Sequence, residues 1–241
     1  MPKRLEMLSD DDATGVGKEV LDACALLLGR TANLQRILAQ HNPYFARWIL
    51  GLVATVRQPA LGATSDPRLR SLAIIKTSMA NACEYCTEHT SVFGQGLGII
   101  PDECALLDSD AYKESSLFTD KEKAVIAWAE AVTLNTSRRD KALWDELKRL
   151  CSDVEIVEVT VASAMFNMIN RLNDSFWTEL EPLEINKKQW DAVKDTSLSI
   201  DDVEAFAGRF SPSGQADRDS IQPAAAQTDG TRQHANMRSD V

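Results

Sequence analysis

Residues 66–90 read DPRLRSLAIIKTSMANACEYCTEHT, and this stretch decides the expected fold. It opens with Asp66, an N-cap residue, followed by Pro67 at the first helical position, which predicts the start of a helix. Apolar residues then recur at helical spacing until the chain reaches a C-x-x-C pair. The stretch therefore predicts an apolar helix that leads directly into two cysteines.

The motif after this helix combines two thiols with one of only three histidines in the chain. Cys83 is expected in the first turn of the next helix, where unpaired backbone N–H groups and the helix dipole favour a thiolate. Cys86 and His89 are three residues apart, so they should share one helix face, and the imidazole can exchange a proton with the thiol. Thiolate attack on a peroxide gives a sulfenic acid, which the second cysteine resolves as a disulfide. The spacing predicts a redox centre with Cys83, Cys86 and His89 as its catalytic residues.

Two other interpretations fit the same residues. Zinc could be held by Cys83, Cys86 and His89 with a fourth ligand or a water, although no second C-x-x-C or C-x-x-H pair completes a structural zinc site. The three side chains could also simply pack in a core. A covalently attached haem is excluded, because the residue after Cys86 is Thr87 and not a histidine.

The rest of the chain carries helix signals and no alternating strand pattern. Thr119-x-x-Glu122 and Ser152-x-x-Glu155 are capping boxes, and each precedes an apolar pattern of helical period. Residues 156–172 are apolar almost all round, as in a helix at the centre of a bundle or in a subunit interface. The fold class is therefore expected to be all-α.

Composition divides the chain into three parts. Residues 1–29 are expected to form an N-terminal helical extension that ends at Gly29, and residues 30–207 a helical domain. Residues 208–241 are rich in Ser, Gln, Ala, Asp and Gly and contain few large apolar residues. Such a segment cannot bury enough apolar surface to offset the entropy of ordering, which predicts a disordered tail.

Charge and targeting signals limit the expected partners. The formal net charge is -10 and the pI is about 4.8, which argues against nucleic acid or an anionic membrane as a partner. No apolar run is long enough to span a bilayer, and the first residues lack the apolar region of a secretory signal. Five cysteines, an odd number without such a signal, are poor evidence for a disulfide framework. We expect a cytoplasmic protein.

Residues 66–90 resemble the core motif of the carboxymuconolactone decarboxylase/AhpD-like (alkylhydroperoxidase D-like) superfamily. In that motif an apolar helix leads through an NGC-like junction into C-x-x-C with a nearby histidine. The segments FTDKEKAVIAWAEAVTLN and SDVEIVEVTVASAMFNMINRLNDS resemble the helices that follow it, so the similarity covers roughly residues 30–180. The resemblance implies an all-helical fold and assembly into dimers, trimers or hexamers. For the AhpD-like branch it also implies thiol-dependent peroxide reduction, with electrons from a disulfide-exchange partner and no bound cofactor.

The resemblance also implies roles for single residues. Cys83 matches the first motif cysteine, and Cys86 matches the second, which the family's proton relay serves. His89 stands one residue before the usual position of the relay histidine, which Thr90 occupies here. Ser71 stands where the family places its relay glutamate, and a serine cannot act as a carboxylate base. These departures concern the proton relay and leave the expected fold unchanged.

The expected function is that of a thiol-dependent oxidoreductase, either a peroxidase or a disulfide reductase, with a small-molecule substrate and a thiol reductant protein. One alternative is a carboxymuconolactone decarboxylase-like lyase or isomerase, with His89 as its acid–base group and a small carboxylated or lactone substrate. True decarboxylases of this family typically lack the C-x-x-C pair, which weighs against that alternative. The other alternative is a non-catalytic helical oligomer that senses redox state or binds zinc.

Overall fold

The computed structural model describes residues 4–57 and 62–182. All of them belong to the compact unit formed by residues 1–203. Within the described residues every regular element is a helix, which confirms the expected all-α class, whereas the tail expected at 208–241 lies outside them. In chain order the elements are α1 (Gly15–Leu28), α2 (Asn33–His41), α3 (Pro43–Arg57), α4 (Pro67–Ala80), α5 (Glu84–Gly96), α6 (Pro101–Leu107), η2 (Asp110–Lys113), α7 (Asp120–Thr133), η3 (Ser137–Arg139), α8 (Lys141–Leu150) and α9 (Asp153–Phe176).

The helices begin where their capping residues predict. The Asp66 carboxylate accepts a hydrogen bond from the Arg68 N–H at 2.8 Å and so caps α4. At the start of α7 the Thr119 hydroxyl accepts from the Glu122 N–H, and the Glu122 carboxylate accepts from the Thr119 N–H. The same reciprocal bonds begin α9. These caps pair N–H groups that have no partner within the helix.

Helix α4 is the centre of the described fold, because it packs against α5, α7 and α9. Leu69 and Ala73 belong to one buried cluster with side chains of α7, α8 and α9. Leu72 and Ile75 belong to a second cluster with α7 and the α6 region. Apolar side chains on both faces of α4 are thus removed from water, and the turn after α4 is held between packed helices.

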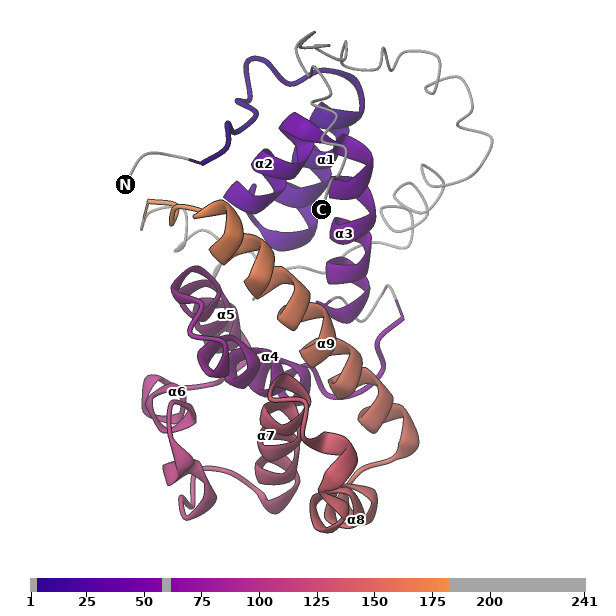
Figure 1. Ribbon diagram of the computed structural model, residues 1–241, viewed down its shortest axis with the longest axis vertical. Coiled ribbons are helices and arrows are strands. Elements are labelled where there is room, and N and C mark those ends of the chain that lie inside the picture. The colour runs from indigo at the N-terminus through magenta and orange to yellow at the C-terminus, as the bar shows by residue number, and fades with distance from the viewer. Residues whose placement is uncertain (1–3, 58–61, 183–241) are drawn as a thin grey trace, which may run out of the picture. The chain divides into compact units, whose positions relative to one another are not determined.

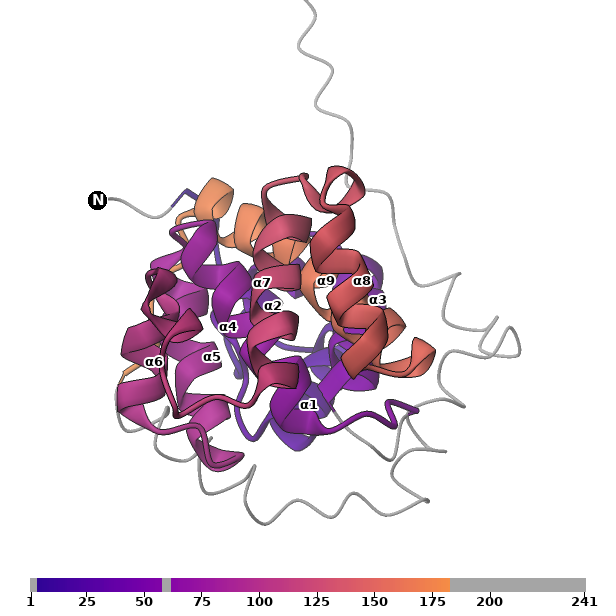
Figure 2. The same cartoon turned by 90° about the horizontal axis from the view of Figure 1, so that it is seen from below.

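Helix α9 links α3, α4 and α5, which come early in the chain, to α7 and α8, which come later. It contacts α3, α4, α5, α7 and α8, and Figure 1 shows it as the long orange helix that runs diagonally between α3 and α4. Helices α7 and α8 lie side by side, as both Figure 1 and Figure 2 show. Helix α1 packs against α2 and α3, so the described part of residues 1–29 lies in the same compact unit as the helices that follow it.

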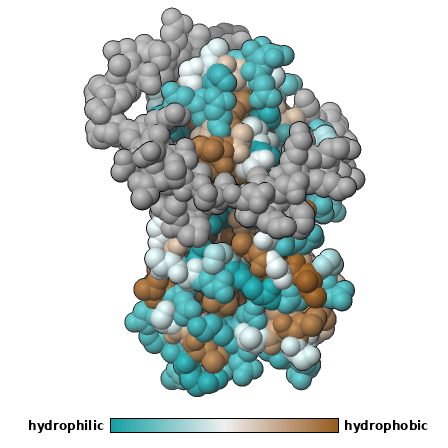
Figure 3. All heavy atoms as spheres, turned by 180° about the vertical axis from the view of Figure 1, so that it is seen from behind, coloured by the Kyte–Doolittle hydropathy of each residue, from teal (hydrophilic) through white to brown (hydrophobic). Residues whose placement is uncertain are grey.

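Two helices expose apolar side chains at helical spacing. Val154, Val157, Val161 and Met168 form an exposed row along α9. On the face in Figure 3, hydrophobic residues of the described part form separate small patches among hydrophilic ones. Phe45, Trp48 and Leu52 form a second exposed row along α3. Among the described residues, no helix combines the length and apolar character needed to traverse a lipid bilayer.

Candidate functional site

The two motif cysteines lie at the turn between α4 and α5. Asn81 caps α4, Ala82 adopts a left-handed conformation with a φ of 52°, and Cys83 is the N-cap of α5. The Cys83 N–H donates to the Ser78 carbonyl at 3.1 Å, which ties the turn to α4. Cys86 follows in the first turn of α5. Both cysteines are free thiols, and they are only 0% and 2% exposed.

Cys86 is the thiol that its surroundings favour as a thiolate. A hydrogen bond from Cys83 lowers the pKa of Cys86 most, and hydrogen bonds from Asn170 and Asn173 lower it further against the effect of burial. Asn173 Nδ2 lies 3.2 Å from Cys86 Sγ. The same bond to Cys86, together with burial, raises the pKa of Cys83. The sequence favoured a thiolate at Cys83, but α5 begins only at Glu84, so Cys83 stands before the first turn and acts as the proton donor.

His89 is held by a carboxylate from a distant part of the chain. Its Nε2 lies 2.5 Å from Glu181 Oε2. The other oxygen, Glu181 Oε1, lies 2.6 Å from Arg30 Nη1 and accepts hydrogen bonds from the Tyr85 hydroxyl at 2.7 Å and the Asn33 N–H at 2.6 Å. Both ring nitrogens of His89 are buried; among the described residues, Nε2 has the close contact with Glu181 and Nδ1 has no hydrogen-bond partner. Glu181 therefore joins α5 to the loop between α1 and α2.

The charges in this cluster keep Glu181 ionised. Burial alone would raise the pKa of Glu181, but the hydrogen bond from His89 and the charge of Arg30 outweigh burial and lower the pKa to about 2. Burial lowers the pKa of His89, and the bond to Glu181 opposes this effect without cancelling it. A neutral imidazole that donates through Nε2 keeps Nδ1 as a proton acceptor. The pair can therefore move a proton at His89 Nδ1.

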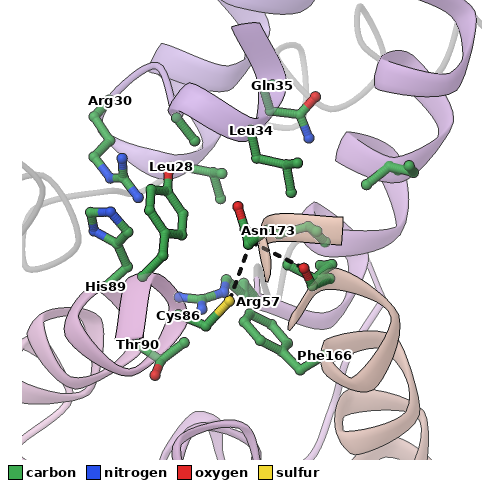
Figure 4. Close-up of a pocket in the computed structure, with 15 residues that line it drawn as sticks. Leu28, Arg30, Leu34, Gln35, Arg57, Cys86, His89, Thr90, Phe166 and Asn173 are labelled. Atoms are coloured by element: carbon green, nitrogen blue, oxygen red, sulfur yellow. Dashed lines mark hydrogen bonds between the residues drawn. The ribbon is translucent and has the colours of Figure 1, made fainter. Parts of the chain in front are cut away.

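A cavity of about 70 Å³ brings the thiol and the imidazole to a common wall. Figure 4 shows His89 and Arg30 on one side of it, with Cys86, Arg57 and Phe166 grouped on another. Apolar side chains form most of the remaining wall. The lining residues are Leu28, Arg30, Ala32, Leu34, Gln35, Ile49, Val53, Arg57, Tyr85, Cys86, His89, Thr90, Phe166, Ile169 and Asn173.

Arg57 is the cation nearest the sulfur side of the cavity. It is the last residue of α3 and is partly buried. Its Cζ lies 4.0 Å from the centroid of the Phe93 ring and 5.1 Å from that of Phe166. Burial and the charge of Arg30 lower the pKa of Arg57 to about 9, whereas Cys86 acts in the opposite direction. The guanidinium thus stays protonated at neutral pH, and no carboxylate of the described residues forms an ion pair with it.

A polar groove of about 480 Å³ adjoins the cavity. Tyr85 and Asn173 line both spaces, so these two side chains stand between the buried cavity and the groove. The groove has three carboxylates on its wall, Glu84, Asp174 and Glu179. The groove reaches the cysteine turn, because Ala82 also lines it.

Known proteins share this arrangement of helices. No protein-family model matches the sequence. The chain is 26% identical over 133 residues to the uncharacterized protein YnjA of Escherichia coli (strain K12), which covers 55% of this chain and 69% of YnjA. The structure of the present chain is similar to that of an alkylhydroperoxidase AhpD core protein, an uncharacterized peroxidase-related protein from Ralstonia eutropha JMP134. The TM-score is 0.65, with 17% identity, and the match covers 79% of this chain and 98% of that one. The chain has the AhpD-like fold. It is also similar to the debrominase Bmp8, as the C82A form in complex with 2,3,4-tribromopyrrole, with a TM-score of 0.65 and 21% identity over 80% of this chain and 98% of that one.

The AhpD-like fold agrees with the resemblance seen in residues 66–90, but the residues around the cysteine pair do not follow the family's proton-relay pattern. Cys86 and His89 both line the cavity, yet in the described structure no hydrogen bond joins them, and His89 binds Glu181 instead. Ser71 is buried in α4 and supplies no carboxylate. Glu181 brings a carboxylate to the imidazole from beyond α9.

Several residues of the site were not identified from the sequence. Arg30 and Arg57 end or follow apolar helices and gave no signal of a role. Asn173 follows Asn170 by three residues on an otherwise apolar helix, so this pair of buried amides is a signal in the sequence. Glu181 lies just past the segment that resembles the family. Its role depends on how the chain folds back, which local spacing does not reveal.

The zinc interpretation finds no ligand cluster in the described structure. Within residues 4–57 and 62–182, no group of three or more His, Cys, Asp or Glu side chains is arranged to hold a metal ion. Cys83 donates a hydrogen bond to Cys86, both remaining free thiols, and the Nε2 of His89 faces Glu181. The geometry instead suits proton transfer beside a pair of thiols.

Proposed function

We propose that the chain is a thiol-dependent oxidoreductase that reduces a small peroxide or comparable electrophile at Cys86. Cys83 is the resolving thiol, His89 the proton-transfer group, and a dithiol protein the final reductant. The observation that carries this proposal is the position of the Cys86 sulfur. It lies on a cavity wall, its pKa is lowered, and a second thiol donates a hydrogen bond to it.

The first step is attack of the Cys86 thiolate on the peroxide. A sulfur–oxygen bond forms, the oxygen–oxygen bond breaks, and the departing alkoxide takes a proton to leave as an alcohol. We assign the proton transfer to His89, whose imidazole lines the same cavity: the neutral ring takes up the proton that the Cys86 thiol loses and returns it to the alkoxide, and the Glu181 carboxylate stabilises the imidazolium in between. Asn173, whose side-chain amide donates a hydrogen bond to Cys86 Sγ, positions the thiolate.

The second step converts the sulfenic acid to a disulfide. The Cys83 sulfur attacks the Cys86 sulfur, and the hydroxyl group leaves as water with the proton of the Cys83 thiol. An external dithiol then reduces the disulfide by exchange and is itself oxidised. The polar groove beside Tyr85 and Asn173 is the approach we propose for that reductant. Regular reduction between turnovers fits a cytoplasmic location, which forms part of this proposal.

Carbon–halogen bonds are a second kind of electrophile that suits the same thiol pair. The similarity to a debrominase concerns the fold, but the apolar wall with Phe166 beside Cys86 is compatible with a small haloaromatic ring. Replacement of bromine by hydrogen consumes two thiols and yields one disulfide and one bromide, so Cys83 and Cys86 together supply the two electrons. Both substrate types therefore require the same two cysteines.

The test is turnover of cumene hydroperoxide and of a brominated pyrrole with dithiothreitol as reductant. Cys86→Ser should reduce turnover by about a thousandfold or more, because it removes the nucleophile. Without dithiothreitol, Cys83→Ser should react once and leave Cys86 as the sulfenic acid, because no resolving thiol remains. Cys104→Ser is the matched control, since Cys104 is also a buried free thiol but lies outside the cavity. Mass spectrometry should show a Cys83–Cys86 disulfide after mild peroxide treatment.

The alternatives predict different results. Full activity in both cysteine variants, or no turnover of either substrate by the wild type, would reject the oxidoreductase. A lactone or carboxylated substrate converted by both cysteine variants and not by His89→Ala would support the lyase or isomerase. Stoichiometric zinc in the purified protein, lost on Cys83→Ser or Cys86→Ser, would support the metal-binding alternative.

A homo-oligomer is also part of the proposal. The exposed apolar rows on α9 (Val154, Val157, Val161 and Met168) and α3 (Phe45, Trp48 and Leu52) support it, because isolated monomers rarely expose apolar side chains in continuous rows. We propose contact between copies of the chain along these helices, in a dimer, trimer or hexamer. Light scattering should show a mass larger than a monomer, and Val157→Glu together with Val161→Glu should shift it to the monomer.

A further inference from the structure

Among the described residues around the cavity, the positive charges outnumber the negative charges that pair with them by one. Arg30 lies against Glu181, so these two opposite charges compensate each other. His89 is held neutral by burial. Arg57 is the remaining ionised group of the lining, with no carboxylate in an ion pair among the described residues. A desolvated charge in an apolar wall is costly unless an opposite charge lies nearby.

The position of Arg57 is fixed by the fold. It ends α3, where the negative end of the helix dipole stabilises a cation. Its guanidinium lies close to the rings of Phe93 and Phe166, an arrangement that leaves N–H groups available to an anion. Figure 4 shows Arg57 beside the sulfur of Cys86, and not on the side of Arg30 and His89.

The charge balance of the proposed reaction fits this arrangement. A thiolate carries one negative charge, and attack on an uncharged peroxide transfers that charge to the departing oxygen. The reacting atoms therefore carry one negative charge from the first contact to the protonation of the leaving group. We infer that Arg57 is the counter-charge for this migrating charge, and that the site is consequently selective for uncharged electrophiles. The inference rests on Cys86 being the reactive thiol of the proposed function.

Substrate selectivity follows from the same balance. An acidic substrate would bring a second negative charge beside the thiolate, and the described lining offers no unpaired cation for it. With an uncharged hydroperoxide or haloaromatic, the thiolate carries the one negative charge to be compensated, and Arg57 supplies the matching positive charge. Because transition-state charge stabilisation acts strongly in a water-poor site, loss of Arg57 should affect the chemical step more than the binding of substrate.

The other charged and titratable groups that face Cys86 are known from the structure. Cys83, before α5, donates a hydrogen bond, and Asp174 on α9 acts against a thiolate. His89 lies one turn further along α5 and pairs with Glu181. Arg57, at the end of α3, is the group with a full positive charge on the sulfur side. Its removal should therefore raise the pKa of the Cys86 thiol, in addition to what the hydrogen bonds from Cys83, Asn170 and Asn173 contribute.

The experiment measures alkylation of Cys86 in the reduced protein, which needs neither peroxide nor reductant turnover. Iodoacetamide is the uncharged reagent, iodoacetate the anionic reagent of similar size, and tandem mass spectrometry locates the label. Arg57→Met should raise the pH midpoint of the reaction with iodoacetamide by about one unit or more, so that the rate at pH 7 falls about tenfold. Arg57→Lys, which keeps the charge, should show a smaller change. In the wild type, iodoacetamide should react at least as fast as iodoacetate.

Control variants separate this role from a general effect on folding. Arg47→Gln changes another arginine of α3, which pairs with Glu19 and does not line the cavity, and it should keep the wild-type profile. If Arg57→Met does not fold by circular dichroism, Arg57→Gln replaces it. An unchanged midpoint on removal of the Arg57 charge would overturn the inference. Preference for iodoacetate in the wild type, lost in Arg57→Met, would also overturn it, because Arg57 would then bind substrate anions. If neither proposed substrate is turned over but the midpoint shifts, the proposed function fails and the inference stands.

Discussion

Two ion clusters of the described residues differ in what they leave unpaired: one lies among the capping residues of α6 and α7, and the other lies beside the cavity and keeps an unused proton acceptor. In the first, which we call the scaffold cluster, Arg68 Nη2 lies 2.5 Å from Glu103 Oε1 and Arg68 Nε lies 2.6 Å from Glu122 Oε1. The two carboxylates also accept hydrogen bonds from the N–H groups of Ile100 and Thr119 at the starts of α6 and α7. Every carboxylate of this cluster thus also fixes a helix end.

The site cluster consists of Arg30, His89 and Glu181. It contains the same arginine–glutamate pairing, but its third member is an imidazole whose Nδ1 has no hydrogen-bond partner among the described residues. Because both clusters contain an arginine–glutamate pair, such a pair alone does not mark a functional site. The site cluster differs because His89 can still accept a proton at Nδ1 and lines a cavity that a thiol also lines.

The largest expected effect comes from breaking the scaffold cluster. Arg68→Met leaves two buried carboxylates without their cation and should lower the free energy of unfolding by about 3–5 kcal/mol. Urea denaturation measures this loss. Arg149→Met, which breaks the exposed pair with Glu146, is the control and should leave the urea midpoint unchanged. A loss for Arg68→Met as small as that of the control would mean that the capping bonds alone hold the carboxylates.

Acid should weaken the site cluster over a defined pH range. The pKa of Glu181 is lowered from 4.5 to about 2, so its ionised form stabilises the folded state above pH 4.5. This contribution, at most about 3 kcal/mol, is lost as the pH falls from 4.5 towards 2, because the unfolded chain takes up the proton first. Glu181→Gln should remove this part of the pH dependence in urea titrations. An identical slope in wild type and variant below pH 4.5 would contradict the ion pairing.

Loss of the Glu181 charge should also reduce catalysis. Glu181→Gln should lower peroxide turnover at pH 7 by about tenfold to a hundredfold, since His89 loses the carboxylate that stabilises its protonated form. The reaction of Cys86 with iodoacetamide should change far less. The double variant Glu181→Gln/His89→Ala should be no slower than His89→Ala alone, because the two residues act as one unit. Additive losses would show that they act separately.

The smallest expected effect concerns the turn that carries the thiols. Ala82 has a φ of 52°, a region that favours glycine, whereas the scaffold cluster stands on ordinary capping boxes. Ala82→Gly should therefore raise the free energy of unfolding by about 1 kcal/mol. Thermal unfolding measures the gain, and Ala80→Gly, inside α4, should instead destabilise. A destabilising Ala82→Gly would show that the turn gains more from the methyl group than it loses to strain.

The sequence predicted the helices better than the site. Asp66 and Pro67, the capping boxes and Gly29 mark helix ends through local hydrogen bonds and backbone preferences, and the structure confirms them. The cysteine pair was likewise visible from spacing alone. The partners of these residues could not be predicted from spacing, because Arg57 reaches the cavity and Glu181 reaches His89 through packing between elements far apart in the chain. The family pattern places a carboxylate at position 71, in the helix before the thiols, whereas the fold brings Glu181 to His89 from beyond α9.

The origin of Glu181 also determines the order in which the site is completed. During synthesis the thiols emerge long before the carboxylate that contacts His89, since Tyr85 and its hydrogen-bond partner Glu181 are 96 residues apart. A nascent chain that has folded only as far as α5 holds the cysteine pair without this carboxylate. The segment after α9 must return to the loop between α1 and α2 before His89 receives its partner, so the site is assembled last, by the closing of a long loop.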